Sequence, residues 1–472
     1  MKKTISLVIS LIIFLMPLTL VNNINKAHCT SSWDSRDLGW VTSVKDQKDG
    51  ICWAYAICAA AETDVIAQGY VADIDFSEGY LYAIHNLYTK DENNTKASGD
   101  TPEMVMKISQ TYNPLALESD YPYSLVDTYT EKDISINPCQ YTITLFGEVK
   151  YENVKDWITK HGAVICGFNM PENQRETYVN NYDKLKENHV ATIIGWDDNI
   201  PAEAFENQPV NSGAWLCKNS WGEDSGDNGY FWLSYEDASI NAYLGLTVSK
   251  KPALTRTGKV PLNQCGKITL SVGGGDSDSY GIGRYFTVKG GSYVDSFNIL
   301  ISENSSYTYK VYSINDIPST KNLIEKNIIK SGTLYSNFND ISLHTINIDY
   351  ITYRDCSLFI EVSTNRNDKL TVGAEQNSSG SYTVQYFSDK IAQVKPTDSL
   401  LRMSLNCVRG YTPDKENITT EAPLTWQTEH PLTEENTAAI QTSDGYNFDV
   451  FKLVVICALL LVILAVFCMI LL

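Results

Sequence analysis

The chain has 472 residues, enough for two or three domains that each bury a core of their own. Its formal net charge is −19, from 37 Lys and Arg against 56 Asp and Glu. No patch rich in Lys and Arg is available to neutralise phosphates, so we exclude nucleic acid as a partner. Acidity spread this evenly is typical of an exported protein surface.

The first apolar segment predicts export. Lys2 and Lys3 precede an apolar run from Ile5 to Val21, which is typical of a secretory signal peptide over residues 1–27. The small residues expected around a cleavage point near position 27 are few. An uncleaved N-terminal anchor therefore stays open as the alternative.

Cysteine usage agrees with export without proving disulfides. Nine cysteines lie between the two apolar ends of the chain, and setting Cys52 aside leaves eight. The even number permits four bridges but does not show them. Cys58, Cys166 and Cys217 fall in apolar helix or strand patterns, for which a free buried cysteine is the commoner reading.

Cys52 stands at the head of an alanine-rich segment that is predicted to be helical to about Gln68. A thiol is a useful nucleophile as its thiolate, and a helix N-terminus and a neighbouring imidazolium both lower its pKa. A buried core thiol is the plainer alternative for a cysteine in such a segment. Cys52 is therefore a candidate nucleophile that needs a base and an orienting group from elsewhere in the chain.

Two downstream motifs offer that base and that orienting group. His189 lies about 137 residues after Cys52, in an apolar run that alternates like a β-strand. Asn219 opens the motif Asn219-Ser220-Trp221-Gly222. A lone strand histidine is usually structural, and an Asn-Ser pair alone would suggest a turn. It is their order after a Cys-Trp pair that points to nucleophilic catalysis.

These motifs resemble those of the papain-like cysteine peptidases. The segment from Val44 to Ala56 is similar to the active-site segment of that family, Asn188 to Trp196 to its histidine strand, and Trp215 to Gly222 to its asparagine segment. Tyr121-Pro122-Tyr123 is a further marker between them. The resemblance covers residues 33–250, where the residue pattern also predicts a helix from Pro102 to Tyr112 and a strand over 164–168. It implies a papain-like, two-lobe α+β fold in which a helical lobe supplies the nucleophile and a β-rich lobe supplies the histidine and asparagine.

The resemblance also assigns a role to each site residue. Cys52 would attack the peptide carbonyl, His189 would take the thiol proton and return it to the leaving amine, and Asn219 would orient the imidazole. Trp221 would cover the bond between His189 and Asn219 from water. Gln47 would stabilise the oxyanion together with the backbone N–H of Cys52. No metal or cofactor is required.

The sequence departs from the family pattern just before the nucleophile. Five steps rather than six separate Gln47 from Cys52, and Asp49 stands where the family has a bridging cysteine. The Gln47 loop must therefore be tighter and held without that disulfide. Gly99 lies where the family uses a glycine pair to bind substrate backbone, so it is the candidate substrate-binding residue.

Beyond about residue 251 the pattern changes to short β-rich runs with polar turns between them, which predicts a β-sandwich. Residues 276–408 resemble the lectin-like domain that follows the peptidase in some clostridial-type surface peptidases. That resemblance leaves a surface or glycan ligand open for this domain. Asp276 and Asp278 could supply oxygens to a structural Ca²⁺, although a solvated acidic turn is the reading we favour. The runs are 285–288, 296–301, 307–312, 357–362 and 382–387.

The C-terminal segments predict a tether. Residues 409–446 are rich in Thr, Glu and Pro and hold too little apolar surface to offset the entropy of ordering, so we expect a disordered stalk. Residues 453–472 carry no charge over a length that spans a bilayer as a helix. A removable lipid-anchor signal, with small residues at 443–445, is the alternative.

The sequence thus predicts an exported, surface-tethered cysteine endopeptidase that acts on polypeptides and is anchored by its C-terminal helix. The rival reading is an adhesion or binding protein whose peptidase-like domain is inactive. The unusual Gln47 loop favours the rival, whereas the presence of Cys52, His189 and Asn219 favours the enzyme.

Overall fold

The computed structural model describes most of the chain between Thr30 and Val408. The predicted signal peptide, stalk and membrane helix lie outside the described residues, as do Gly99 and the acidic turn at 276–278. Within the part that is described, the helices are too short or too polar to cross a membrane. The described ranges are 30–89, 101–172, 177–251, 254–257, 269–272, 279–301, 306–336, 338–363, 370–375, 381–387, 390–397 and 400–408.

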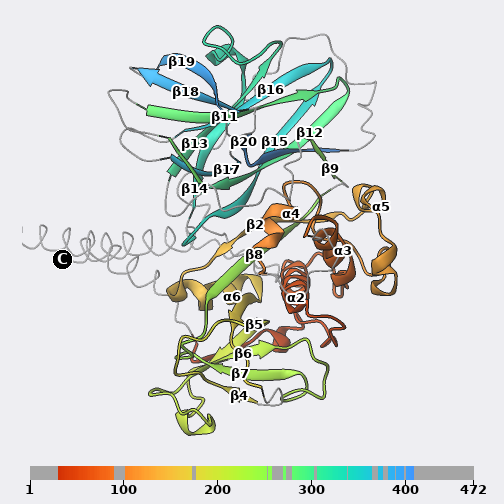
Figure 1. Ribbon diagram of the computed structural model, residues 1–472, viewed down its shortest axis with the longest axis vertical. Helices are drawn as coiled ribbons and strands as arrows, with labels where there is room; N and C mark the ends of the chain where they lie inside the picture. Colours follow the sequence, from red (N-terminus) through yellow and green to blue (C-terminus); the bar gives the residue numbers. More distant parts are fainter. Residues whose placement is uncertain are drawn as a thin grey trace, which may run out of the picture. The chain divides into compact units, whose positions relative to one another are not determined.

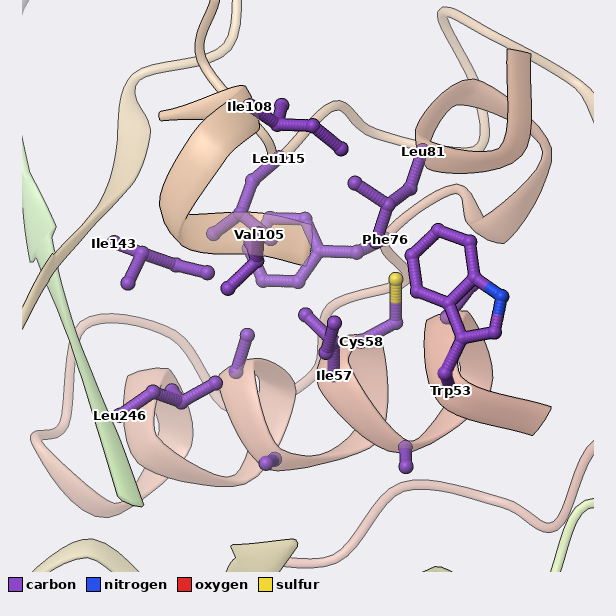
Figure 2. Close-up of a cluster of buried hydrophobic side chains, with 14 of the residues drawn as sticks. Trp53, Ile57, Cys58, Phe76, Leu81, Val105, Ile108, Leu115, Ile143 and Leu246 are labelled. Carbon is purple, nitrogen blue, oxygen red and sulfur yellow. The ribbon is translucent and has the colours of Figure 1, made fainter. Parts of the chain in front are cut away.

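The first lobe is built around helix α2 (Cys52–Ala67), where the alanine-rich segment favours a helix. Thirteen of its 16 residues are buried, so protein surrounds the helix on nearly all sides. Figure 2 shows side chains of α2 pointing into an apolar cluster shared with neighbouring segments. Around it lie α3 (Glu78–Thr89), α4 (Met104–Ile108), α5 (Glu131–Ser135) and the 3₁₀ helix η2 (Tyr123–Thr128).

The helix expected from Pro102 to Tyr112 is shorter than predicted. Only α4, Met104–Ile108, is helical, and the backbone N–H groups of Thr111 and Tyr112 both turn back to the carbonyl of Ile108. Pro114 follows closely, and a proline can neither donate to a helix nor tolerate a helical residue before it.

The second lobe is an antiparallel sheet with the strand order β2-β8-β3-β5-β6-β7. Strand β5 begins at His189, and its neighbour β6 ends one residue before Asn219, with Thr192 opposite Lys218. Figure 1 shows β5, β6 and β7 side by side. The strands are β2 (Tyr141–Glu148), β3 (Val164–Phe168), β5 (His189–Asp197), β6 (Ala214–Lys218), β7 (Tyr230–Ser234) and β8 (Ala242–Lys250), with β1 (Ser32–Asp34), β4 (Tyr178–Val179) and helix α6 (Val154–His161) beside them.

One contact joins the lobes near the site, and a second set of contacts holds the segment before α2. The hydroxyl of Thr192 in β5 donates to the carbonyl of Ala56 in α2 at 3.3 Å. The ammonium of Lys45 lies 3.0 Å from Glu62 of α2 and 2.8 Å from Glu78 of α3. Because Lys45 precedes Gln47 by two residues, this buried cluster anchors the start of the Gln47 loop.

The C-terminal part is a sandwich of two sheets, as predicted. The second sheet has the order β14-β13-β16-β11-β18-β19, with β18 and β19 at one edge (Figure 1). Its strands are β11 (Ser279–Val288), β13 (Ser306–Ile314), β14 (Ile328–Tyr335), β16 (Cys356–Ser363), β18 (Ser381–Phe387) and β19 (Lys390–Thr397). The first sheet contains β9 (Leu254–Thr257), β10 (Thr269–Val272), β12 (Ser292–Ile301), β15 (Ser342–Thr352), β17 (Leu370–Glu375), β20 (Leu400–Leu401) and β21 (Met403–Val408).

The first sheet of the sandwich continues the sheet of the β-rich lobe. Strand β15 pairs antiparallel with β2, with Leu343 opposite Phe146 and His344 opposite Leu145. Leu300 and Leu343 of the sandwich belong to the same buried apolar cluster as α2. The sandwich therefore shares sheet and core with the peptidase-like lobes, which the sequence did not indicate.

The cysteines of the described residues are all free. Cys58, Cys166 and Cys217 are buried, as predicted, and none of the seven described cysteines forms a disulfide. The four bridges that the even count permitted are therefore not formed within this part of the chain.

Candidate active site

Cys52 is the first residue of α2 and is partly buried. Ile51, which precedes it, makes no side-chain cap, so the helix N-terminus is left open toward the thiol. The backbone N–H groups of Val190, Trp53 and Cys52 itself act to lower the pKa of the thiol. The residue thus sits between the start of α2 and the start of β5.

His189 and Asn219 form the pair that the sequence predicted. The ring nitrogen Nε2 of His189 lies 2.9 Å from Oδ1 of Asn219. That same oxygen accepts the backbone N–H of Ser220 at 2.8 Å, which identifies it as the amide oxygen. An oxygen can only accept here, so Nε2 carries the proton and Nδ1 is the basic nitrogen of the ring.

Trp221 lies over the imidazole. The ring centroids of Trp221 and His189 are 4.2 Å apart with a tilt of 33°. An apolar ring at this distance excludes water from one face of the imidazole and restricts its rotation. This placement agrees with the covering role expected for Trp221.

The electrostatics differ from the expectation of a lowered thiol pKa. Burial raises the pKa of Cys52, the surrounding backbone N–H groups lower it, and the charge of Glu187 raises it further. Burial also lowers the pKa of His189 to about 4, against the opposing effect of the Asn219 hydrogen bond. The imidazole is therefore neutral at pH 7 and supplies no positive charge to the thiol in this state. The arrangement suits proton transfer from thiol to imidazole once a substrate is bound.

Both polar atoms of the Gln47 side-chain amide form hydrogen bonds. Its Oε1 accepts the hydroxyl of Ser220 at 2.6 Å, and its Nε2 donates to the backbone carbonyl of Asp49 at 2.8 Å. Its backbone N–H donates to the carbonyl of Ser220 at 2.7 Å. An amide nitrogen has two hydrogens, so Nε2 keeps one donor after bonding Asp49.

The predicted residues meet at one cavity of about 500 Å³. Gln47, Cys52, His189 and Trp221 all line it. Among the described residues no hydrogen bond joins the thiol of Cys52 to the ring of His189, which is common for catalytic pairs without a bound substrate. Gly99 lies outside the described residues, and Thr101, two positions later, lines the same cavity.

Sequence reasoning missed three features of this site. Ser220 fixes the amide of Gln47, and its place beside Asn219 in the motif was the available signal. Glu187 lines the cavity two residues before His189. Tyr123 donates a hydrogen bond to Asp49, a pairing between segments far apart in sequence for which no local signal exists.

A helix-borne cysteine facing a strand histidine with an asparagine partner is the arrangement of a papain-like cysteine peptidase. Residues 29–245 match the model of the papain family of cysteine proteases, and this part of the chain belongs to that family. The predicted family and the cysteine-peptidase class of the domain are thereby confirmed.

Curated relatives agree with this assignment over the same region. Cysteine proteinase 3 of Entamoeba histolytica is 27% identical over 206 residues, which are 42% of this chain and 60% of the relative. The viral cathepsin of Heliothis zea nuclear polyhedrosis virus is 27% identical over 42% of this chain and 50% of its own length. Oryzain gamma chain of rice is 27% identical over 43% of this chain and 54% of its own. The chain thus spans half to three fifths of these relatives.

Solved structures extend the likeness to the sandwich. A structure of the cysteine protease and lectin-like domains of Cwp84, a surface layer associated protein of Clostridium difficile, covers 80% of this chain with a TM-score of 0.65 at 19% identity. A second Cwp84 structure, after propeptide cleavage, also covers 80% of the chain, with a TM-score of 0.64 at 20% identity. The predicted fold, a two-lobe papain-like unit followed by a β-sandwich, is confirmed.

Proposed function

We propose that this chain hydrolyses peptide bonds with Cys52 as nucleophile and His189 as base. The observation that carries the proposal is the hydrogen bond from Nε2 of His189 to Asn219, beside a cavity that Cys52 also lines. This bond fixes the tautomer of His189 in which Nδ1 is free to take a proton. A histidine with a purely structural role does not need a free basic nitrogen at a cavity.

The reaction follows from these assignments. Nδ1 of His189 takes the thiol proton as the sulfur of Cys52 attacks the carbonyl carbon of the scissile bond. The tetrahedral intermediate collapses to a thioester, and the imidazolium gives its proton to the departing amine. A water molecule, deprotonated by the neutral imidazole, then attacks the thioester and releases the acid and the free thiol.

The oxyanion would be stabilised by the backbone N–H of Cys52 and by the remaining hydrogen on Nε2 of Gln47. A donor of this kind is worth about 2.7–4 kcal/mol because it meets charge that develops only in the transition state. Two hydrogen bonds support this role, since they fix the Gln47 amide before substrate arrives: Ser220 donates to its oxygen, and its nitrogen donates to the carbonyl of Asp49.

We also propose that the protein acts at the cell surface, with domains at 33–250 and 276–408, a stalk at 409–446 and a membrane helix at 453–472. The support is the apolar, charge-free C-terminal segment together with the N-terminal export signal. The likeness to Cwp84, itself described as surface layer associated, points the same way. Its lectin-like domain also keeps a surface or glycan ligand open for the sandwich of this chain.

The rival function is a binding protein with an inactive peptidase domain, and an active-site probe separates the two. The full-length protein is treated with a peptidyl epoxide that alkylates activated thiolates, and the adduct is mapped by mass spectrometry. We expect one adduct, on Cys52, which is lost in Cys52→Ala and strongly reduced in His189→Ala. Cys356→Ala, which removes a half-buried thiol of the sandwich, is the matched control and should label normally. A folded protein that leaves Cys52 unlabelled would support the binding protein.

A further inference from the structure

The cavity that holds Cys52 and His189 also contains a carboxylate. Glu187 lines it two residues before His189 and is partly buried. The reaction proposed above uses no carboxylate at this place. Its charge is nevertheless felt at the nucleophile, because after burial and the backbone contacts it is one of the influences on the pKa of Cys52.

The surrounding chain is built to hold this carboxylate. Oε2 of Glu187 accepts a hydrogen bond from Nδ2 of Asn241 at 3.0 Å, and the backbone N–H of Asn241 donates to the carbonyl of Gly167 at 2.9 Å. A Cβ atom at Gly167 would lie 2.4 Å from the same Oε2. Glycine at 167, in strand β3, therefore leaves the space that Glu187 occupies, and Asn241 sets its direction.

No cation of the described residues neutralises Glu187. Among the described residues its carboxylate accepts one hydrogen bond, from Asn241, and takes part in no ion pair. The neighbouring Lys186 also lines the cavity, but it is exposed and makes no ion pair in the described part of the chain. Glu187 is thus a partly buried carboxylate that lines the cavity without an ion-pair partner among the described residues.

We propose that Glu187 is a specificity-determining residue, which selects a substrate with an Arg or Lys side chain beside the scissile bond. This inference rests on the peptidase function proposed above and names its substrate class. Glu187 and Cys52 line one cavity of about 500 Å³, so a side chain that reaches the carboxylate belongs to a residue close to the bond under attack.

A cationic side chain fits this place for two reasons. An ion pair at a partly buried position is screened less by water and salt than one on an open surface. A substrate cation beside Glu187 would also offset the negative charge that this residue places near Cys52, and so would favour the thiolate. An acidic side chain at the same position would be repelled, which adds discrimination.

The test uses matched fluorogenic peptides that differ at one position between arginine, its neutral isostere citrulline, and glutamate. The position is moved over the two residues on either side of the scissile bond, and kcat/KM is measured with the full-length protein. At one position we expect arginine to exceed citrulline by about tenfold or more. In Glu187→Gln this ratio should fall to near one, because the neutral amide no longer distinguishes arginine from citrulline.

Glu203→Gln removes an exposed carboxylate outside the cavity and should leave the ratio unchanged. The proposal is overturned if arginine and citrulline peptides are cleaved equally at every position, or if Glu187→Gln keeps the preference. If no peptide is cleaved and the epoxide leaves Cys52 unlabelled, the proposed peptidase function is contradicted, and the role of Glu187 in substrate selection is contradicted with it. Labelling of Cys52 with equal cleavage of all peptides overturns the role of Glu187 alone.

Discussion

The hydroxyl of Tyr123 donates a hydrogen bond to the carboxylate of Asp49, across 74 positions of sequence. Asp49 in turn accepts Nε2 of Gln47 and the backbone N–H of Ile51 on its carbonyl oxygen. The short loop before the nucleophile is therefore fastened to the start of η2 by a side-chain bond. This contact stands where the related peptidases are expected to use a disulfide.

Removing the Tyr123 hydroxyl should loosen the Gln47 loop without unfolding the lobe. We expect Tyr123→Phe to lower kcat by about three- to tenfold with little change in KM, because a hydrogen bond to a charged group is lost while the aromatic packing stays. Asp49→Asn, which keeps an acceptor oxygen, should lose less than Asp49→Ala. Steady-state kinetics on one peptide compare the four proteins. If kcat of Tyr123→Phe equals that of the wild type, the Gln47 loop does not depend on the hydrogen bond from Tyr123 to Asp49.

The reacting groups should act as a unit. Cys52→Ala should abolish peptide hydrolysis, and His189→Ala should come close, with a loss of at least about 10²–10⁴-fold. Asn219→Ala should leave a measurable rate, because it removes an orienting bond and leaves both reacting groups in place. Thermal melting of each variant controls for misfolding. Near-normal hydrolysis by Cys52→Ala would eliminate the mechanism.

Local sequence motifs were the main basis for predicting the site residues. Cys52, His189 and Asn219 each lie in a stretch whose order and neighbours identify it, and the fold brings His189 and Asn219 into contact as expected. The strand at 164–168 was predicted with its bounds, because an apolar run between turns is a short-range signal. The helix at 102–112 was too long, because the turn after Ile108 competes with helix propensity.

What could not be predicted depends on contacts between distant segments. The bond from Asn241 to Glu187 and the pairing of β15 with β2 depend on which strands become neighbours, and no local pattern encodes that. The lowered pKa expected for Cys52 was wrong for a related reason. Burial by the folded protein raises the pKa of the thiol more than the surrounding backbone N–H groups lower it.

The C-terminal segment should decide where the protein is found. A disordered stalk of about 38 residues would have a root-mean-square reach of roughly 30–37 Å, enough to hold an acidic domain away from an anionic bilayer. Deleting residues 447–472 should shift the protein from the membrane fraction to the medium with an unchanged peptidase rate. Full-length protein found free in the medium would mean that the tail is a processing signal and no anchor.

Buried histidines should make folding stability fall in mild acid. Burial lowers the pKa of His344, at the junction of the sandwich with β2, to about 4, and that of His189 also to about 4. The unfolded chain takes up these protons near pH 6.5, so the stability they contribute is complete above about pH 6.5 and is lost as the pH falls toward 4.

The test is chemical denaturation between pH 4.5 and 7.5 for wild type and His344→Gln. One histidine in this window contributes a slope of about 1.4 kcal/mol per pH unit to the free energy of unfolding. The variant should therefore show a flatter acid limb, whatever its absolute stability at pH 7.5. Parallel acid limbs for the two proteins would contradict the assignment of a depressed pKa to His344.

The shared sheet predicts that the sandwich supports the peptidase lobes directly. Phe338 follows β14, is only 5% exposed, and packs against Trp157 of α6 with ring centroids 5.7 Å apart. A Cβ atom at Gly147 of β2 would lie 2.7 Å from its ring, so the two parts are in close contact. Phe338→Ala should lower the free energy of unfolding by about 3–5 kcal/mol. Peptidase activity should then be lost in the same thermal transition that reports on the sandwich.

Tyr335→Ala, which removes an aromatic ring that is 69% exposed at the end of β14, is the matched control and should change stability by less than about 0.5 kcal/mol. If Phe338→Ala instead melts like wild type, or if activity outlasts unfolding of the sandwich, the sandwich is an independent module and the pairing of β15 with β2 adds little to the peptidase.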